Sequence, residues 1–82
     1  MYFVYLLLSQ IKSKQIYIGS TNNLDKRLKQ HNQGKVFSTK PYLPWTIIYY
    51  EAYQNEELAK LREKRLKHHG NAIRELKKRV DL

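Results

Sequence analysis

Five polar side chains in this sequence have types and positions that could serve chemistry together. Tyr5 and Tyr17 lie in two apolar segments near the start, and Arg27 and His31 follow, four residues apart. Glu63 stands far downstream as a lone acid among basic residues. Cleavage of a phosphodiester needs a base to activate water, cations to stabilise the phosphate charge and usually a metal ion. The five residues are of the types that supply these functions.

Each of these residues also has a simpler interpretation. The chain holds seven tyrosines, and most tyrosines fill strand surfaces. Free tyrosine is a poor base because its pKa is about 10, although Arg27 and a metal ion would favour the phenolate of Tyr17. His31 would be favoured at a helix C-terminus by the helix dipole. Glu63 has the spacing of a weak helix-surface ion pair with Lys67.

The composition indicates one small basic domain over residues 1–82. There is no cysteine, so neither disulfides nor a thiolate zinc site can stabilise the fold. The net charge of +9 favours nucleic acid as the partner, ahead of an anionic membrane surface. The apolar run at 2–8 is too short to span a bilayer and lacks the flanks of a secretion signal, so we expect a cytoplasmic protein, bacterial from its small format.

Hydrophobic patterns predict three strands and three helices. The strands are expected at 2–8, 15–19 and 45–53, and the helices at 23–32, at 56–69 and from Asn71 onward, with a loop at 35–45. Asn22 and Asn55 are expected as N-caps, and Gly70 as the end of the second helix. The order β-β-α-β-α-α predicts an α/β (α+β) fold in which helices flank a three-stranded antiparallel sheet.

Helical periodicity assigns faces to the two longer helices. Leu24 and Leu28 share a face, with Arg27 and His31 at its border, neither buried nor free. In the second helix, the residues expected to be buried are Leu58, Leu61 and Leu66. Glu63 lies beside that apolar stripe, where one carboxylate, with waters and a substrate phosphate, suffices for Mg²⁺.

Basic residues near these segments predict a path for a nucleic-acid backbone. The region 60–79 holds nine Lys or Arg and two Glu, a net charge of +7. The expected contacts to nucleic acid are Lys26, Lys35, Lys40, Arg62 and Lys67.

Four blocks of the sequence resemble the GIY-YIG nuclease superfamily. They are FVYLL at 3–7, YIGSTNNLDKRLKQHNQGK at 17–35, PWTIIYYEAY at 44–53 and AKLREKRLK at 59–67. The chain is most similar to the small stand-alone members related to the UvrC N-terminal domain and the Slx1 nuclease domain. It has Phe3 where the family name has glycine, a position that varies in this branch.

The resemblance implies hydrolysis of nucleic-acid phosphodiesters with a single Mg²⁺, for which Mn²⁺ is a substitute. It implies that Tyr17 activates the attacking water and that Tyr5 helps to position water or phosphate. Arg27 would stabilise the phosphate, and His31 would be an auxiliary proton-transfer or orienting group. Glu63 would bind the metal.

The resemblance leaves the substrate and the partners open. DNA is the expected substrate and RNA the alternative, with a role in repair or recombination. The zinc module of the Slx1 type and the extra domains of UvrC are absent, so we expect a protein partner that sets substrate choice. The alternatives are a non-catalytic nucleic-acid-binding module and a basic interaction protein such as a ribosome-associated one.

Overall fold

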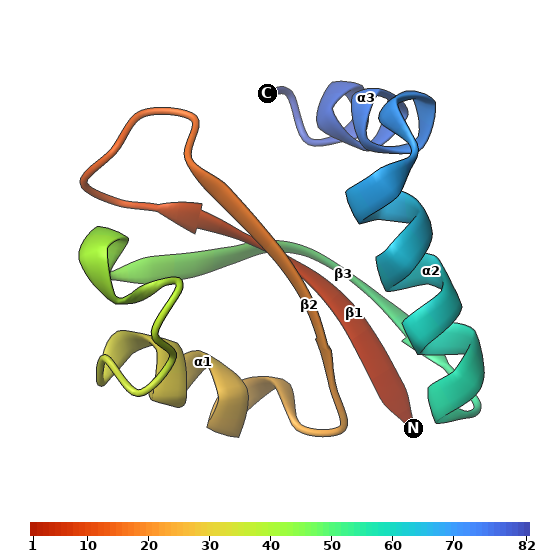
Figure 1. Ribbon diagram of the computed structural model, residues 1–82, viewed down its shortest axis with the longest axis horizontal. Coiled ribbons are helices and arrows are strands. Elements are labelled where there is room, and N and C mark those ends of the chain that lie inside the picture. The colour runs from red at the N-terminus through yellow and green to blue at the C-terminus, as the bar shows by residue number, and fades with distance from the viewer.

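The computed structural model describes all 82 residues and contains one antiparallel sheet. Strand β1 (Tyr2–Ser9) is central, between β2 (Ile16–Thr21) and β3 (Trp45–Tyr53). Its middle residues, Val4 to Leu7, are all buried because helices cover both faces of the sheet (Figure 1). The predicted fold class and element order are confirmed.

Helix α1 (Leu24–Asn32) covers one face of the sheet (Figure 1). Leu24 and Leu28 pack there against a small core of Tyr5, Leu7 and Trp45, as the helical periodicity predicts. The N-cap, however, is Asn23 and not Asn22: its side chain accepts a hydrogen bond from the backbone N–H of Lys26. The cap lies one residue later because β2 continues to Thr21, beyond its predicted end at residue 19.

Helices α2 (Glu56–His68) and α3 (Gly70–Arg79) lie on the other side (Figure 1). The larger core there consists of buried side chains from both strands and helices: Val4, Leu6, Ile18, Ala59, Leu66 and Leu76. Asn55 caps α2, as predicted, by accepting from the backbone N–H of Leu58. A short 3₁₀ helix, η1 (Lys40–Tyr42), lies in the loop that precedes β3.

Two predictions about α2 are wrong. Leu58 and Leu61 are 45% and 61% exposed, because the face toward the sheet is formed instead by Ala59, Leu66 and the half-buried Arg62 and Glu63. Gly70 does not end α2. The helix stops at His68, and Gly70 begins α3.

None of the helices has both the length and the apolar character needed to cross a membrane.

Candidate active site

Tyr5 and Tyr17 lie on the same face of the sheet, as the hairpin predicts, with ring centroids 6.5 Å apart. Gly19 is paired with Tyr5 across the two strands. A Cβ at Gly19 would lie 2.4 Å from the Tyr5 hydroxyl oxygen and 2.6 Å from its Cζ. The absence of a side chain at Gly19 therefore allows the Tyr5 ring to lie across β2.

His31 joins the two tyrosines from the last turn of α1. Its ring centroid is 5.9 Å from that of Tyr5 and 5.1 Å from that of Tyr17. Its Nε2 is 3.0 Å from the Tyr5 hydroxyl, and its Nδ1 is 2.8 Å from the Thr39 hydroxyl. The side chain is fully buried, which corrects the expectation that His31 lies at the border of the helix face. The tyrosines and Thr39, on the loop after α1, enclose it.

Burial sets the protonation of this pair. It raises the pKa of Tyr5 to about 12, and the nearby Arg27 guanidinium opposes that rise only in part. Burial also lowers the pKa of His31 to about 4, and the Arg27 charge acts in the same direction. At neutral pH, Tyr5 is therefore a phenol and His31 a neutral imidazole.

Glu63 reaches the edge strand β2 from α2. Its Oε1 accepts a 2.5 Å hydrogen bond from the Ser20 hydroxyl, and its Oε2 accepts a 2.7 Å bond from the Lys67 ammonium. Burial disfavours the charged carboxylate, but the bonds from Lys67 and Ser20 outweigh it and lower the pKa of Glu63. The side chain is 16% exposed, so an ionised carboxylate is held at the surface of the site.

The five predicted residues converge at the β2 edge. The Lys67 ammonium that binds Glu63 also lies 5.5 Å from the centroid of the Tyr17 ring. The charge of Arg27 lowers the pKa of Tyr5, and that of Glu63 raises it. Residues from β1, β2, α1 and α2 thus form one cluster, although Glu63 lies 32 or more positions from the other four in the sequence.

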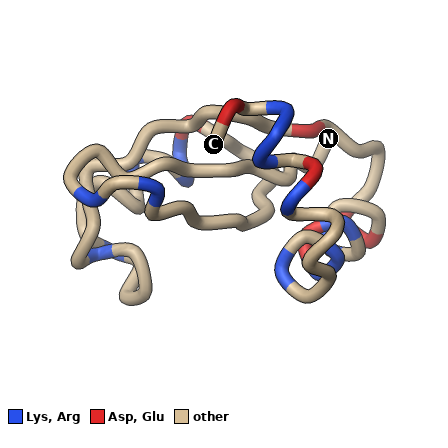
Figure 2. Tube along the Cα trace, turned by 90° about the horizontal axis from the view of Figure 1, so that it is seen from above, with Lys and Arg blue, Asp and Glu red and all other residues tan.

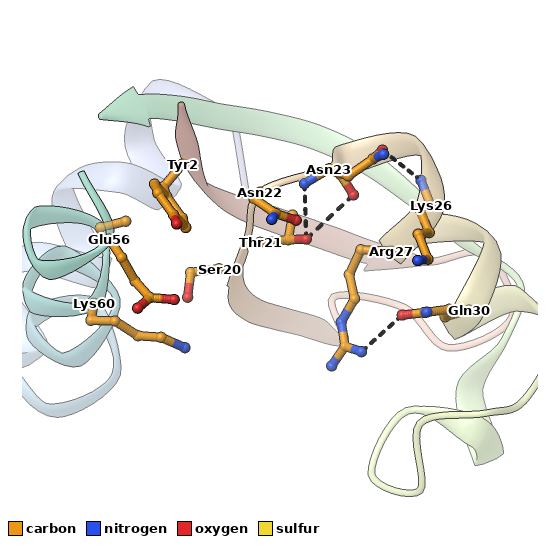
Figure 3. Close-up of a pocket in the computed structure, with 11 residues that line it drawn as sticks. Tyr2, Ser20, Thr21, Asn22, Asn23, Lys26, Arg27, Gln30, Glu56 and Lys60 are labelled. Carbon is orange, nitrogen blue, oxygen red and sulfur yellow. Dashed lines mark hydrogen bonds between the residues drawn. The ribbon is translucent and has the colours of Figure 1, made fainter. Parts of the chain in front are cut away.

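A polar cleft of about 340 Å³ opens beside this cluster, between the first turns of α1 and α2. Figure 3 shows Arg27 from α1 and Lys60 from α2 on its opposite walls, with Ser20 between them. Lys26 and Glu56 also line it. The Arg27 guanidinium donates to the Gln30 side chain at 3.0 Å, and both residues line the cleft. The lining suits a polyanionic backbone.

The five basic residues predicted to contact nucleic acid have different surroundings. Lys26 lines the cleft, and Lys35 and Lys40 are exposed on the loop after α1. Lys67 is bound to Glu63, and Arg62 donates two 2.9 Å bonds to Glu51. Figure 2 shows Lys and Arg at both ends of the molecule, on α2 and α3 at one end and on loops at the other.

Two residues that sequence reasoning did not assign complete the site. Ser20 anchors Glu63, and Thr39 anchors His31. Ser20 could have been predicted as a site residue, because it directly follows the Tyr-Ile-Gly block. Nothing in the sequence pointed to Thr39, because it lies in a polar loop and becomes buried only in the folded protein.

The donor set fits a magnesium ion held by few protein ligands. The chain has no group of three or more His, Cys, Asp or Glu side chains that could enclose a metal ion. Glu63 is ionised and partly exposed, and Mg²⁺ is often held by one or two carboxylates plus water and phosphate. The Lys67 ammonium now occupies one oxygen of Glu63 and would have to leave it.

The fold and the site define a class, and comparison with known proteins agrees. Residues 1–78 match the GIY-YIG catalytic domain. This chain therefore belongs to the GIY-YIG family, and its enzyme class is that of a nuclease, which confirms the prediction from sequence.

Several known proteins are similar in sequence to this chain. A UPF0213 protein of Clostridium perfringens is 39% identical over 64 residues, which are 77% of this chain and 67% of that protein. A UPF0213 protein of Streptococcus pyogenes serotype M5 is 38% identical over 56 residues, 67% of this chain and 61% of the relative. The structure-specific endonuclease subunit SLX1 of Debaryomyces hansenii is 47% identical over 53 residues, 57% of this chain and 15% of that subunit.

Proposed function

We propose that this chain is a Mg²⁺-dependent endonuclease that hydrolyses DNA phosphodiester bonds. The observation that carries the proposal is the convergence of ionised Glu63 with Arg27 and two tyrosines beside a polar cleft. Binding of nucleic acid alone would not need a carboxylate held in this position in a protein of charge +9. The relative named as a structure-specific endonuclease subunit supports the same conclusion.

The environments of the two tyrosines favour Tyr17 as the base. Tyr17 is half-buried, so water can reach it, whereas Tyr5 is buried and its hydroxyl is bonded to His31. Because its pKa is raised, Tyr5 also stays protonated at neutral pH. In this mechanism Tyr17 acts as its phenolate, after its own proton has gone to solvent, and accepts a proton from the attacking water as the water oxygen bonds to phosphorus. The bond from phosphorus to the sugar oxygen then breaks, and that oxygen takes a proton from solvent.

Arg27 is the cation proposed to bind the phosphate. A guanidinium offers several donors in a rigid fork, which matches phosphate oxygens. Arg27 lines the cleft from one wall, while Lys26 and Lys60 supply further positive charge along it. We infer that the scissile phosphate binds at Arg27 and that the neighbouring backbone follows the cleft.

Glu63 would hold the metal ion, and Ser20 keeps its carboxylate in place. A bound Mg²⁺ would polarise the phosphate and stabilise its added negative charge. Because Lys67 is 38% exposed and flexible, its ammonium can move to solvent or to a phosphate when Glu63 takes a metal.

The test is cleavage of end-labelled duplex, single-stranded, flap and branched DNA, and of RNA, with Mg²⁺ or with EDTA. Wild type runs beside Glu63→Gln and Tyr17→Phe. Glu57→Gln is the matched control for the acid, since Glu57 is exposed on the same helix. Tyr50→Phe is the control for the tyrosine, since Tyr50 is 56% exposed on β3.

We expect cleavage that needs Mg²⁺, disappears in Glu63→Gln and Tyr17→Phe, and persists in both controls. Tight, salt-sensitive binding without cleavage by any of the proteins would instead identify a non-catalytic nucleic-acid-binding module. The five substrates decide between DNA and RNA and between branched and linear forms.

A protein partner that selects the substrate is part of the proposal. The chain spans less than two thirds of several of its curated relatives, and one of these is named as a subunit. Action in DNA repair or recombination, in the cytoplasm of a bacterium, stays a prediction.

A further inference from the structure

A line of buried hydrogen bonds runs from the loop after α1 into the site. Thr39, His31 and Tyr5 are 1%, 0% and 3% exposed. The Thr39 hydroxyl is 2.8 Å from His31 Nδ1, and His31 Nε2 is 3.0 Å from the Tyr5 hydroxyl. A neutral imidazole has one N–H donor and one acceptor nitrogen, so the line has a direction that the distances alone do not give.

The outer end of the line fixes one direction. The Thr39 hydroxyl has a single proton, and the Val36 carbonyl 3.3 Å away is an acceptor for it. A hydroxyl that donates to Val36 is an acceptor toward His31, and this direction assigns the ring proton to Nδ1. The Trp45 indole N–H, bonded at 3.0 Å to the Thr39 carbonyl, holds this residue in place.

The inner end is compatible with the same direction. With its proton on Nδ1, His31 has an unprotonated Nε2, which is an acceptor for the Tyr5 hydroxyl 3.0 Å away. The Tyr5 proton is then directed to His31, and the lone pairs of the Tyr5 oxygen remain free.

We propose that Thr39 is a positioning residue which, through His31, fixes the direction of the Tyr5 hydroxyl in the site. Thr39 holds His31 with its proton on Nδ1. The unprotonated Nε2 then accepts the hydrogen bond from Tyr5, which leaves the lone pairs of the Tyr5 oxygen free. The inference rests on the proposed function only in its final step, the use of Tyr5 beside the phosphate.

The first test is the tautomer of His31 in the wild-type protein, read from the nitrogen chemical shifts of its ring by NMR near pH 7. We expect Nδ1 protonated and Nε2 unprotonated. The Nε2–H tautomer, or an even mixture of the two, would overturn the proposal. This measurement needs no cleavage, so it decides the tautomer even if the nuclease proposal fails.

The second test compares Thr39→Val with Thr39→Ser. Valine has nearly the same shape but offers no acceptor, so His31 should lose its preference for the Nδ1–H form. Serine keeps the hydroxyl and should keep that form. With cleavable DNA, Thr39→Val should lower kcat by roughly 10-fold to 100-fold with little change in KM, and Thr39→Ser should recover most of it.

A purely structural role would give different results. Thr39→Val would then lower stability in urea yet keep the Nδ1–H form and the wild-type kcat. That outcome, or equal kcat losses for the valine and serine variants, would reject the positioning role. If Thr39→Val does not fold, the wild-type tautomer and the serine variant still decide.

Discussion

Gly19 offers a sharp test of how the site is assembled. Gly19→Ala would place a methyl group 2.4 Å from the Tyr5 hydroxyl oxygen and 2.6 Å from its Cζ. Real Cβ contacts are longer than 3.0 Å, so one of the two residues must move. The Tyr5 ring has little freedom to do so, because it is buried and bonded to His31.

The expected cost has two parts. Overpacking a well-packed core costs about 1–3 kcal/mol. Displacing the Tyr5 hydroxyl from His31 adds about 0.5–1.5 kcal/mol for the lost hydrogen bond. We therefore expect Gly19→Ala to lower the free energy of unfolding by roughly 2–4 kcal/mol and to reduce cleavage more than the loss of folded protein explains.

Urea unfolding followed by the fluorescence of Trp45, which is the single tryptophan and is buried, measures the cost. Gly70→Ala is the control: a Cβ there meets no atom within 4 Å, so stability should stay equal or rise slightly. In a Tyr5→Ala background, Gly19→Ala should cost almost nothing. If Gly19→Ala is as stable and active as wild type, the argument from the Tyr5 contact is refuted.

Three further predictions concern charge. Burial disfavours the charged form of Glu51, but the hydrogen bonds from Arg62 and two tyrosines outweigh it and lower the pKa of Glu51 to about 2. The ionised carboxylate therefore stabilises the fold above pH 4.5, and this stabilisation is lost as the pH falls toward 2. In Glu51→Gln, the free energy of unfolding should depend less on pH between 4.5 and 2. Lys67→Met should raise the affinity for Mn²⁺ severalfold, as measured by calorimetry, because Lys67 is bonded to Glu63. Lys64 has no such bond, so Lys64→Met should raise the affinity much less. Equal effects of the two variants would show that only the net charge matters. Lys60 lines the cleft, so Lys60→Met should reduce the slope of log K for DNA binding against log salt concentration by about 1. An unchanged slope would exclude the cleft as the path of the DNA backbone.

Elements with a strong local pattern were predictable from the sequence. The apolar run of β1, the β-branched and aromatic run of β3, and the Asn55 cap with acids in the first turn are encoded by neighbouring residues. The ends of strands and helices were predicted less accurately, because they depend on pairing with distant segments. Strand β2 continues to Thr21 along β1, and the N-cap of α1 is therefore Asn23 and not Asn22.

The prediction of which α2 side chains are buried was partly wrong for a related reason. Periodicity identifies an apolar stripe but not what the stripe faces. In the fold, part of the sheet-facing side of α2 is polar: Arg62 meets Glu51, and Glu63 meets Ser20. The leucines at 58 and 61 are left exposed, since no strand or helix covers them.

Residue types and local patterns were enough to predict the element order and the family, and the sequence motifs pointed to the five candidate site residues. The environments of these residues came only from the packing of the folded chain. It buried His31, raised the pKa of Tyr5, kept Glu63 ionised and brought Thr39 against His31. Protonation and hydrogen-bond direction depend on desolvation and on partners from other segments, and these exist only once the sheet and helices have packed together.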